Sequence, residues 1–242
     1  MLRHAVGLSS GAERASHTSS VHTAARLHHR TLRPQRHPGR QLHIIDTCQL
    51  LGQSRAFKYE RASLDSLALA VQQCTAKAAA RLQLYRWVLF NYLLGNGDNH
   101  LKNLSFHISH ESIQLAPAYD LLCTAIYDTQ AFSSRPSWPR APLALSLGEA
   151  TRFDQVSRVT LLQAGQTLGL TPASAQRELN RMLTRLATQA DHLLAEIEAG
   201  YPACIAASPE PQQAALHQAG ELRLLHAIRH VVLADTLGRV QE

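Results

Sequence analysis

Apolar residues recur at helical spacing along most of the second half of the chain, and this pattern predicts a largely helical domain. Residues 81–94 contain no glycine or proline and are apolar on most sides, which predicts a buried helix. Three further helices, each apolar on one face, are predicted over residues 154–168, 174–199 and 216–237. The sequence from Gly200 to Pro202 is expected to end the second of these, because proline interrupts a helix.

A different pattern, in which apolar and polar residues alternate, follows the first predicted helix. It occurs at Leu104–Ile108 and again at Ser112–Leu115, and it predicts two short strands. Residues 109–111 connect them closely enough for a β-hairpin. Residues 133–142, which contain three prolines, predict a loop. The expected fold is therefore α+β and mostly helical, with one small hairpin.

Three polar residues around this hairpin have the spacing of a phosphotransferase site. Asp98 and Asn103 lie five positions apart, and Asp120 follows Asp98 by 22 positions. In protein kinases an Asp-x-x-x-x-Asn loop supplies the base that accepts the substrate proton and a Mg²⁺ ligand, and a later Asp also binds metal. Mg²⁺ prefers such oxygen ligands and retains several waters. The short motif alone is weak evidence, because Asp and Asn also cap ordinary turns.

Two longer strings surround these residues: residues 90–103 read FNYLLGNGDNHLKN, and residues 115–122 read LAPAYDLL. Together they resemble the HipA-like toxin kinases. Members of that family typically read F-N-x-L-x-G-N-x-D-x-H-x-K-N, followed by L-x-P-A-Y-D-L-L. Looser similarity covers residues 42–52, 57–60 and 143–148, so the resemblance extends over about residues 41–240. It implies a protein-kinase-like C-terminal lobe over residues 41–242.

The resemblance also implies a role for each polar residue of the motif. Asp98 is expected to be the catalytic base, and Asn103 and Asp120 are expected to be the Mg²⁺ ligands. Lys102 is expected to contact the γ-phosphate of ATP. His100 either orders the loop or approaches a phosphate.

The implied activity is that of a Ser/Thr protein kinase toxin of a toxin–antitoxin system, which uses Mg²⁺ and transfers the γ-phosphate of ATP to a protein hydroxyl. The implied partners are a protein substrate and a small DNA-binding antitoxin, and the expected location is the cytoplasm. The alternative is a catalytically inactive remnant that binds an antitoxin or another partner.

The sequence contains no recognisable nucleotide-binding motif. Phosphoryl transfer uses a loop over the phosphates and a lysine held on a strand of the other lobe. The only lysines are Lys58, Lys77 and Lys102, and no glycine-rich loop precedes the catalytic segment. The sequence therefore predicts a truncated kinase, which carries the acid–base and metal-binding half and is incomplete by itself.

Residues 1–40 differ in composition from the rest and are predicted to form a disordered basic tail. Residues 1–45 hold seven arginines and one acid, which account for the whole formal net charge of +6. The pI near 9.5 therefore belongs to the tail, and no direct nucleic-acid binding is expected of the folded lobe. Three interpretations stay open: a disordered arm for anionic partners, a segment resembling a mitochondrial transit peptide, or out-of-frame sequence.

The sequence does not favour a membrane, disulfide-rich or zinc protein. No apolar run approaches the roughly 20 residues that a membrane-spanning helix needs. The four cysteines are scattered without a C-x-x-C pair, so reduced thiols are expected. His107 and His110 flank the predicted hairpin, but their spacing relative to His100 fits no zinc pattern.

Overall fold

A computed structural model describes residues 43–241. The disordered tail predicted for residues 1–40 lies outside the described residues. The α-helices are α2 (Thr47–Leu50), α3 (Leu64–Gln72), α4 (Lys77–Leu94), α5 (Arg158–Thr167), α6 (Pro172–Ala206), α7 (Pro211–Ala227) and α8 (Ala234–Gln241). The strands are β1 (His43–Asp46), β2 (Ser105–Ile108), β3 (Ile113–Leu115), β4 (Pro142–Leu147) and β5 (Ala150–Arg152). The predicted fold class, mostly helical with small antiparallel sheets, is confirmed.

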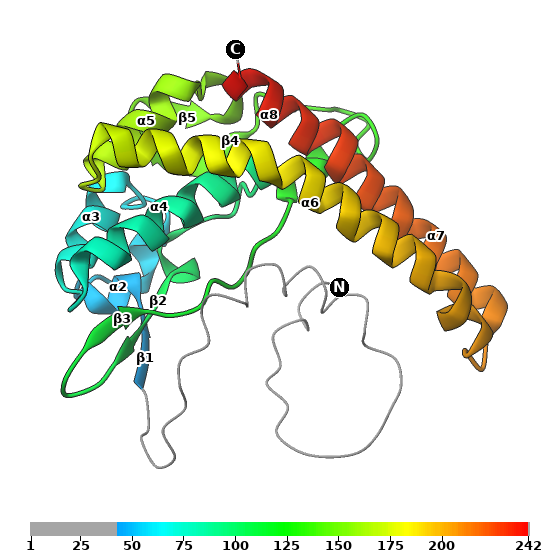
Figure 1. Cartoon of the computed structure of the whole chain (residues 1–242), viewed down its shortest axis with the longest axis horizontal. Coiled ribbons are helices and arrows are strands. Elements are labelled where there is room, and N and C mark those ends of the chain that lie inside the picture. The colour runs from blue at the N-terminus through cyan, green and yellow to red at the C-terminus, as the bar shows by residue number, and fades with distance from the viewer. Residues whose placement is uncertain (1–42, 242) are drawn as a thin grey trace.

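Helix α4 lies at the centre of the helical part and contacts α3, α5, α6 and α8 (Figure 1). Tyr85, Leu89 and Leu93 are completely buried, as expected of a helix that is apolar on most sides. The helix predicted over residues 81–94 is therefore confirmed, although it begins earlier, at Lys77. Burying a large apolar side chain stabilises the folded state by about 1.5–3 kcal/mol. The three buried side chains therefore hold α4 firmly in the core, and the loop that follows it starts from a fixed position.

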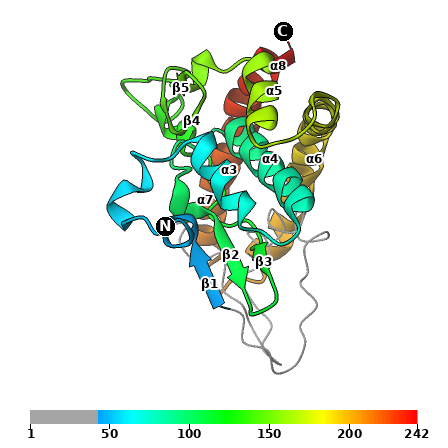
Figure 2. The ribbon, with the colours of Figure 1, turned by 90° about the vertical axis from the view of Figure 1, so that its left-hand side faces the viewer.

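Strands β1, β2 and β3 form an antiparallel sheet in that order (Figure 2). The predicted hairpin is confirmed as β2–β3, with Phe106 opposite Leu115. Strand β1, which the residue pattern did not predict, pairs with β2 and sets Ile45 opposite Phe106. Phe106 is completely buried in the main hydrophobic core. The short 3-10 turn η2 (Leu101–Asn103) leads almost directly into β2, so this sheet fixes the end of the candidate loop.

A second antiparallel hairpin, β4–β5, packs beside α3 and α5 (Figure 2). Leu145 and Leu147 of β4 are buried in the main core. Residues 129–141, which precede β4, contain no helix or strand. The loop predicted over residues 133–142 is therefore confirmed as far as Pro142, where β4 begins.

The longest helix runs further than the sequence predicts. Helix α6 continues through Gly200 and Pro202 to Ala206, so the predicted stop was wrong. A proline inside a helix removes one backbone hydrogen bond and strains the preceding turn. Packing against α7 offsets this cost, because Tyr201 is buried and its hydroxyl donates to Glu221 Oε2 at 3.1 Å. Figure 1 shows α6 and α7 running side by side as one long arm.

Two other helix boundaries also differ from the prediction. The helix predicted to begin near residue 154 begins at Arg158, because Ser157 caps it and accepts a hydrogen bond from the backbone of Thr160. The last predicted helix, residues 216–237, is longer than expected: α7 passes through a π-helical turn (Ile228–Leu233) into α8. Among the described residues, no helix is both long and apolar enough to cross a membrane.

Candidate active site

The candidate catalytic loop begins where α4 ends. Gly95 follows the helix with φ of 73°, a left-handed conformation that favours glycine. A Cβ atom added there would lie only 2.6 Å from Val232 Cγ1 and 2.9 Å from Ala125 Cβ. The close approach presses the end of α4 against two other segments and so fixes the start of the loop.

Asn96 connects the loop to the segment that carries Asp120. Its Nδ2 donates to the backbone oxygen of Asp120 at 3.1 Å and to Oδ1 of Asn91 at 2.7 Å. Its Oδ1 accepts from the backbone N–H of Asp98 at 3.1 Å. The side chain is only 3% exposed, so solvent hardly competes for these bonds. Asn96 therefore holds the backbones of both candidate acids in one place, a role that its sequence position did not reveal.

Asn103 and Asp120 meet directly, as the spacing predicts. Asn103 Nδ2 donates to Asp120 Oδ2 at 2.7 Å. This orientation leaves Asn103 Oδ1 buried and without a hydrogen-bond partner among the described residues. Asp120 has φ of 56°, which is unusual for a residue other than glycine and marks a constrained backbone.

An unpartnered amide oxygen beside a carboxylate suits a hard divalent cation. Mg²⁺ takes one or two protein oxygens and completes its shell with water and phosphate oxygens. The oxygens of Asn103 and Asp120 therefore fit Mg²⁺. Within the described part of the chain, no group of three or more His, Cys, Asp or Glu residues could hold a metal ion. A Mg²⁺ site that takes its remaining ligands from nucleotide phosphates and water needs no such group of side chains.

Asp98, the predicted base, has a partner that the spacing argument missed. The hydroxyl of Tyr59 donates to Asp98 Oδ1 at 2.6 Å. This hydrogen bond, together with burial and the carboxylate charge, raises the pKa of Tyr59 to about 12. Tyr59 is 47% exposed, so this hydrogen bond is open to solvent. Sequence reasoning noted residues 57–60 only as part of the family resemblance and gave them no chemistry.

His100 lies between this tyrosine and a lysine. Its ring makes an edge-to-face contact with Tyr59, with ring centroids 4.9 Å apart. Lys58 Nζ lies 3.2 Å from His100 Nε2. Burial, followed by the Lys58 charge, lowers the pKa of His100, so the imidazole is neutral near pH 7. The charges of Asp98 and Asp120 oppose this shift of the His100 pKa.

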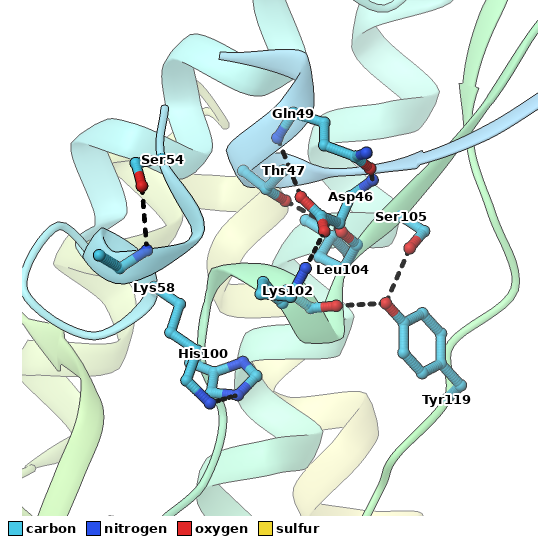
Figure 3. Close-up of polar contacts among 11 residues, drawn as sticks. Asp46, Thr47, Gln49, Ser54, Lys58, His100, Lys102, Leu104, Ser105 and Tyr119 are labelled. Carbon is cyan, nitrogen blue, oxygen red and sulfur yellow. Dashed lines mark hydrogen bonds and ion pairs between the residues drawn. The ribbon is translucent and has the colours of Figure 1, made fainter. Parts of the chain in front are cut away.

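Lys102 points toward the sheet. Its ammonium forms an ion pair with Asp46 at the end of β1 (Figure 3). The hydroxyl of Tyr119 contacts the carbonyl oxygen of Lys102 and lies 2.7 Å from Ser105 Oγ. These contacts fasten the loop to β1 and β2. The expectation that Lys102 contacts a γ-phosphate stays a prediction. In the structure its ammonium is paired with the Asp46 carboxylate instead.

Comparison with known proteins identifies the family of this chain. Residues 9–193 match the family described as the HipA-like C-terminal domain, and the chain belongs to this family. The match begins upstream of residue 41, where the motif resemblance starts. The tail interpretations stay open, since residues 1–42 are not described.

Curated relatives match over shorter stretches. The Ser/Thr-protein kinase toxin HipA of Shewanella oneidensis is 35% identical over an alignment of 100 residues that covers 36% of this chain and 23% of that protein. A Sinorhizobium fredii protein described by name as a kinase is 36% identical over 95 residues, 38% of this chain and 22% of its own length. The matched regions thus span less than a quarter of these relatives.

A solved structure supports the fold over a longer stretch. The complex of HipA, HipB and operator DNA from Shewanella oneidensis aligns with a TM-score of 0.57 at 23% identity. The alignment covers 84% of this chain and 48% of that chain. At this level of identity the similarity concerns the fold.

Proposed function

We propose that this chain is the C-terminal catalytic lobe of a HipA-type Ser/Thr protein kinase, which transfers the ATP γ-phosphate to a protein hydroxyl. One observation carries the proposal: Asn103 donates to Asp120 and leaves its own Oδ1 buried, with no hydrogen-bond partner in residues 43–241. An ordinary turn would satisfy that oxygen, because an unpaired buried polar atom costs about 1–3 kcal/mol. A bound cation would satisfy it.

In the proposed mechanism each residue has one task. Asp98 accepts the proton of the acceptor hydroxyl as phosphoryl transfer proceeds, and Asn96 holds its backbone in position. Asn103 and Asp120 would hold Mg²⁺, which when bound neutralises charge on the phosphates. Neutral His100 orders the loop between Asp98 and its neighbours. Since catalysis of this reaction is mainly positioning and charge stabilisation, these fixed contacts are its main requirement.

A DNA-binding antitoxin is the partner that we propose for this chain. The support is family membership together with the Shewanella structure, which is a complex of HipA with HipB and operator DNA. A protein is the proposed substrate, and the cytoplasm is the proposed location.

The competing function is a non-catalytic, antitoxin-binding remnant. It is favoured by the absence of a strand lysine and a glycine-rich loop from these 242 residues. With half of the phosphate-binding apparatus missing, transfer by the 242 residues alone is expected to be slower by several orders of magnitude.

Radiolabelled ATP, Mg²⁺ and a general acceptor such as casein give the test. Two forms are compared: the 242-residue chain, and a fusion of residues 41–242 behind the part of Shewanella HipA that precedes its matched region. Labelling by the fusion that disappears in Asp98→Asn supports the proposal. A folded fusion that binds ATP and labels nothing argues for the remnant. Strong labelling by the chain alone would show that it is complete enough to act.

A further inference from the structure

Each of the three lysines has a different environment. Lys102 is paired with Asp46, and Lys77 is the first residue of α4. Lys58 is half-buried, and no carboxylate among the described residues lies within ion-pair distance of it. Its ammonium contacts an imidazole nitrogen of His100 at 3.2 Å and lies 4.5 Å from the ring centroid of Tyr59. A partly desolvated ammonium with only neutral partners favours a nearby anion.

The position of this ammonium relative to the candidate base is defined by two neighbours. Tyr59, the next residue, donates to Asp98, while Lys58 itself contacts His100, two positions after Asp98. Figure 3 shows Lys58 reaching His100 while Lys102 turns to Asp46. The ammonium of Lys58 therefore lies beside the loop that carries Asp98.

Local structure holds Lys58 there. It ends the 3-10 turn η1 (Arg55–Lys58), which Ser54 caps by accepting from the N–H of Ala56 at 3.4 Å. This turn contacts η2, the turn that carries Asn103. The lysine thus reaches the loop from a separate, folded segment of the chain.

We propose that Lys58 is the phosphate-binding cation of this site and contacts the terminal phosphates of a bound nucleoside triphosphate. The inference rests on the proposed function and gives Lys58 the contact that the sequence predicts for Lys102. On binding, the ammonium exchanges a neutral acceptor, His100 Nε2, for a charged phosphate oxygen. Both hydrogen bonds have an ionised donor, but only the phosphate oxygen adds the attraction between opposite charges. Lys102 would have to give up its carboxylate to do the same.

An acyl-phosphate derivative of ATP tests this directly. A lysine next to the terminal phosphate attacks the acyl carbonyl, an amide forms, and the nucleotide leaves with its phosphates. Mass spectrometry of the digested chain then reports which of the three lysines carries the acyl group. We expect acylation at Lys58 that excess Mg-ATP suppresses, and only unprotected background at Lys77 and Lys102.

Substitution gives a second, independent measurement. Lys58→Ala should weaken binding of ATP, measured by calorimetry, by about tenfold or more, since a charged hydrogen bond is lost. The matched control, Lys77→Ala, should bind ATP as the unaltered chain does. Thermal unfolding of both variants checks that they are folded.

The outcomes separate the inference from the proposed function. ATP-protected acylation at Lys102, with Lys58 unlabelled, would overturn the inference and leave the kinase proposal standing. Equal ATP affinity in Lys58→Ala and Lys77→Ala would also overturn it. If no lysine is protected and calorimetry detects no ATP binding, the inference fails, whereas the kinase proposal is still decided by labelling with the fusion.

Discussion

Asn103 Nδ2 donates to Asp120 Oδ2 at 2.7 Å, which joins the candidate loop to a segment 17 positions later in the chain. With Nδ2 in this bond, the amide oxygen Oδ1 is buried and has no hydrogen-bond partner in the part of the chain that the structure describes. Two residues thus provide a carboxylate and an oriented carbonyl oxygen at the same point.

Replacing Asn103 with Ala should weaken divalent-metal binding. We expect Mn²⁺ affinity, followed by the electron paramagnetic resonance of the titrated ion, to fall by about tenfold or more, as for other changes around metal sites. Glu196→Gln, an exposed change on α6, is the matched control and should bind Mn²⁺ normally. Unchanged Mn²⁺ binding by Asn103→Ala would remove this residue from the proposed metal site.

Asn96→Leu should destabilise the fold. The change removes three hydrogen bonds and leaves the Asp98 N–H and the Asp120 carbonyl without their partner. The free energy of unfolding, measured by urea denaturation, should fall by about 1–3 kcal/mol. Gln212→Ala, at an exposed position on α7, should change it by less than about 0.5 kcal/mol. A stable Asn96→Leu variant would mean that these bonds contribute little.

Gly95→Ala and Gly52→Ala separate backbone strain from steric overlap. Both glycines have positive φ, 73° and 63°. A Cβ at Gly95 meets Val232 at 2.6 Å, whereas a Cβ at Gly52 has open space. Gly52→Ala should cost about 1–2 kcal/mol from backbone strain alone, and Gly95→Ala should cost clearly more. Equal losses in thermal or urea unfolding would show that the region around Gly95 relaxes easily.

Asp98→Asn should lower the pKa of Tyr59 from about 12 toward the usual value of about 10. An ionised carboxylate stabilises the protonated phenol, and an amide does so less. The titration is followed by near-ultraviolet absorbance, with Tyr59→Phe subtracted to remove the other tyrosines. No difference between Asp98→Asn and the unaltered chain would mean that the two groups do not meet in solution.

The same bond has a defined effect on pH-dependent stability. The folded-state pKa of Tyr59 lies above the unfolded value, so its contribution is fully present below about pH 10. That contribution is lost as the pH rises through about 12. Tyr59→Phe should flatten this part of the stability profile.

Spacing and resemblance predicted the parts of the site that lie close together in the sequence. Asp98, Asn103 and Asp120 were predicted to converge on one cleft. The structure brings Asn103 and Asp120 into contact. Asp98 is connected to Asp120 only through the backbone hydrogen bonds that Asn96 makes to both. Lys58 and Tyr59 could not be found in this way, because they lie at the end of a 3-10 turn about 40 residues upstream. Such a turn has no periodic signal of its own, and only tertiary packing brings it to the loop.

In the helical part, too, local sequence predicted some features and tertiary packing determined others. A buried helix ending at Gly95 followed from the apolar pattern and the glycine that succeeds it. The continuation of α6 through Pro202 did not, because propensity arguments ignore the packing of Tyr201 against α7. Local signals therefore predicted elements, and contacts between elements decided where they end.

The hydrogen bonds around Asn96 also bear on the chemical durability of the protein. An asparagine followed by glycine is prone to lose ammonia, because the glycine nitrogen can attack the side-chain carbonyl. Here the N–H of Gly97 donates to Thr124 Oγ1 at 2.7 Å, and the Asn96 amide is held by three bonds of its own. Folding thus restrains both reacting groups. Deamidation at Asn96 should follow unfolding, and it would place a carboxylate against the Asp120 carbonyl, where refolding requires a donor.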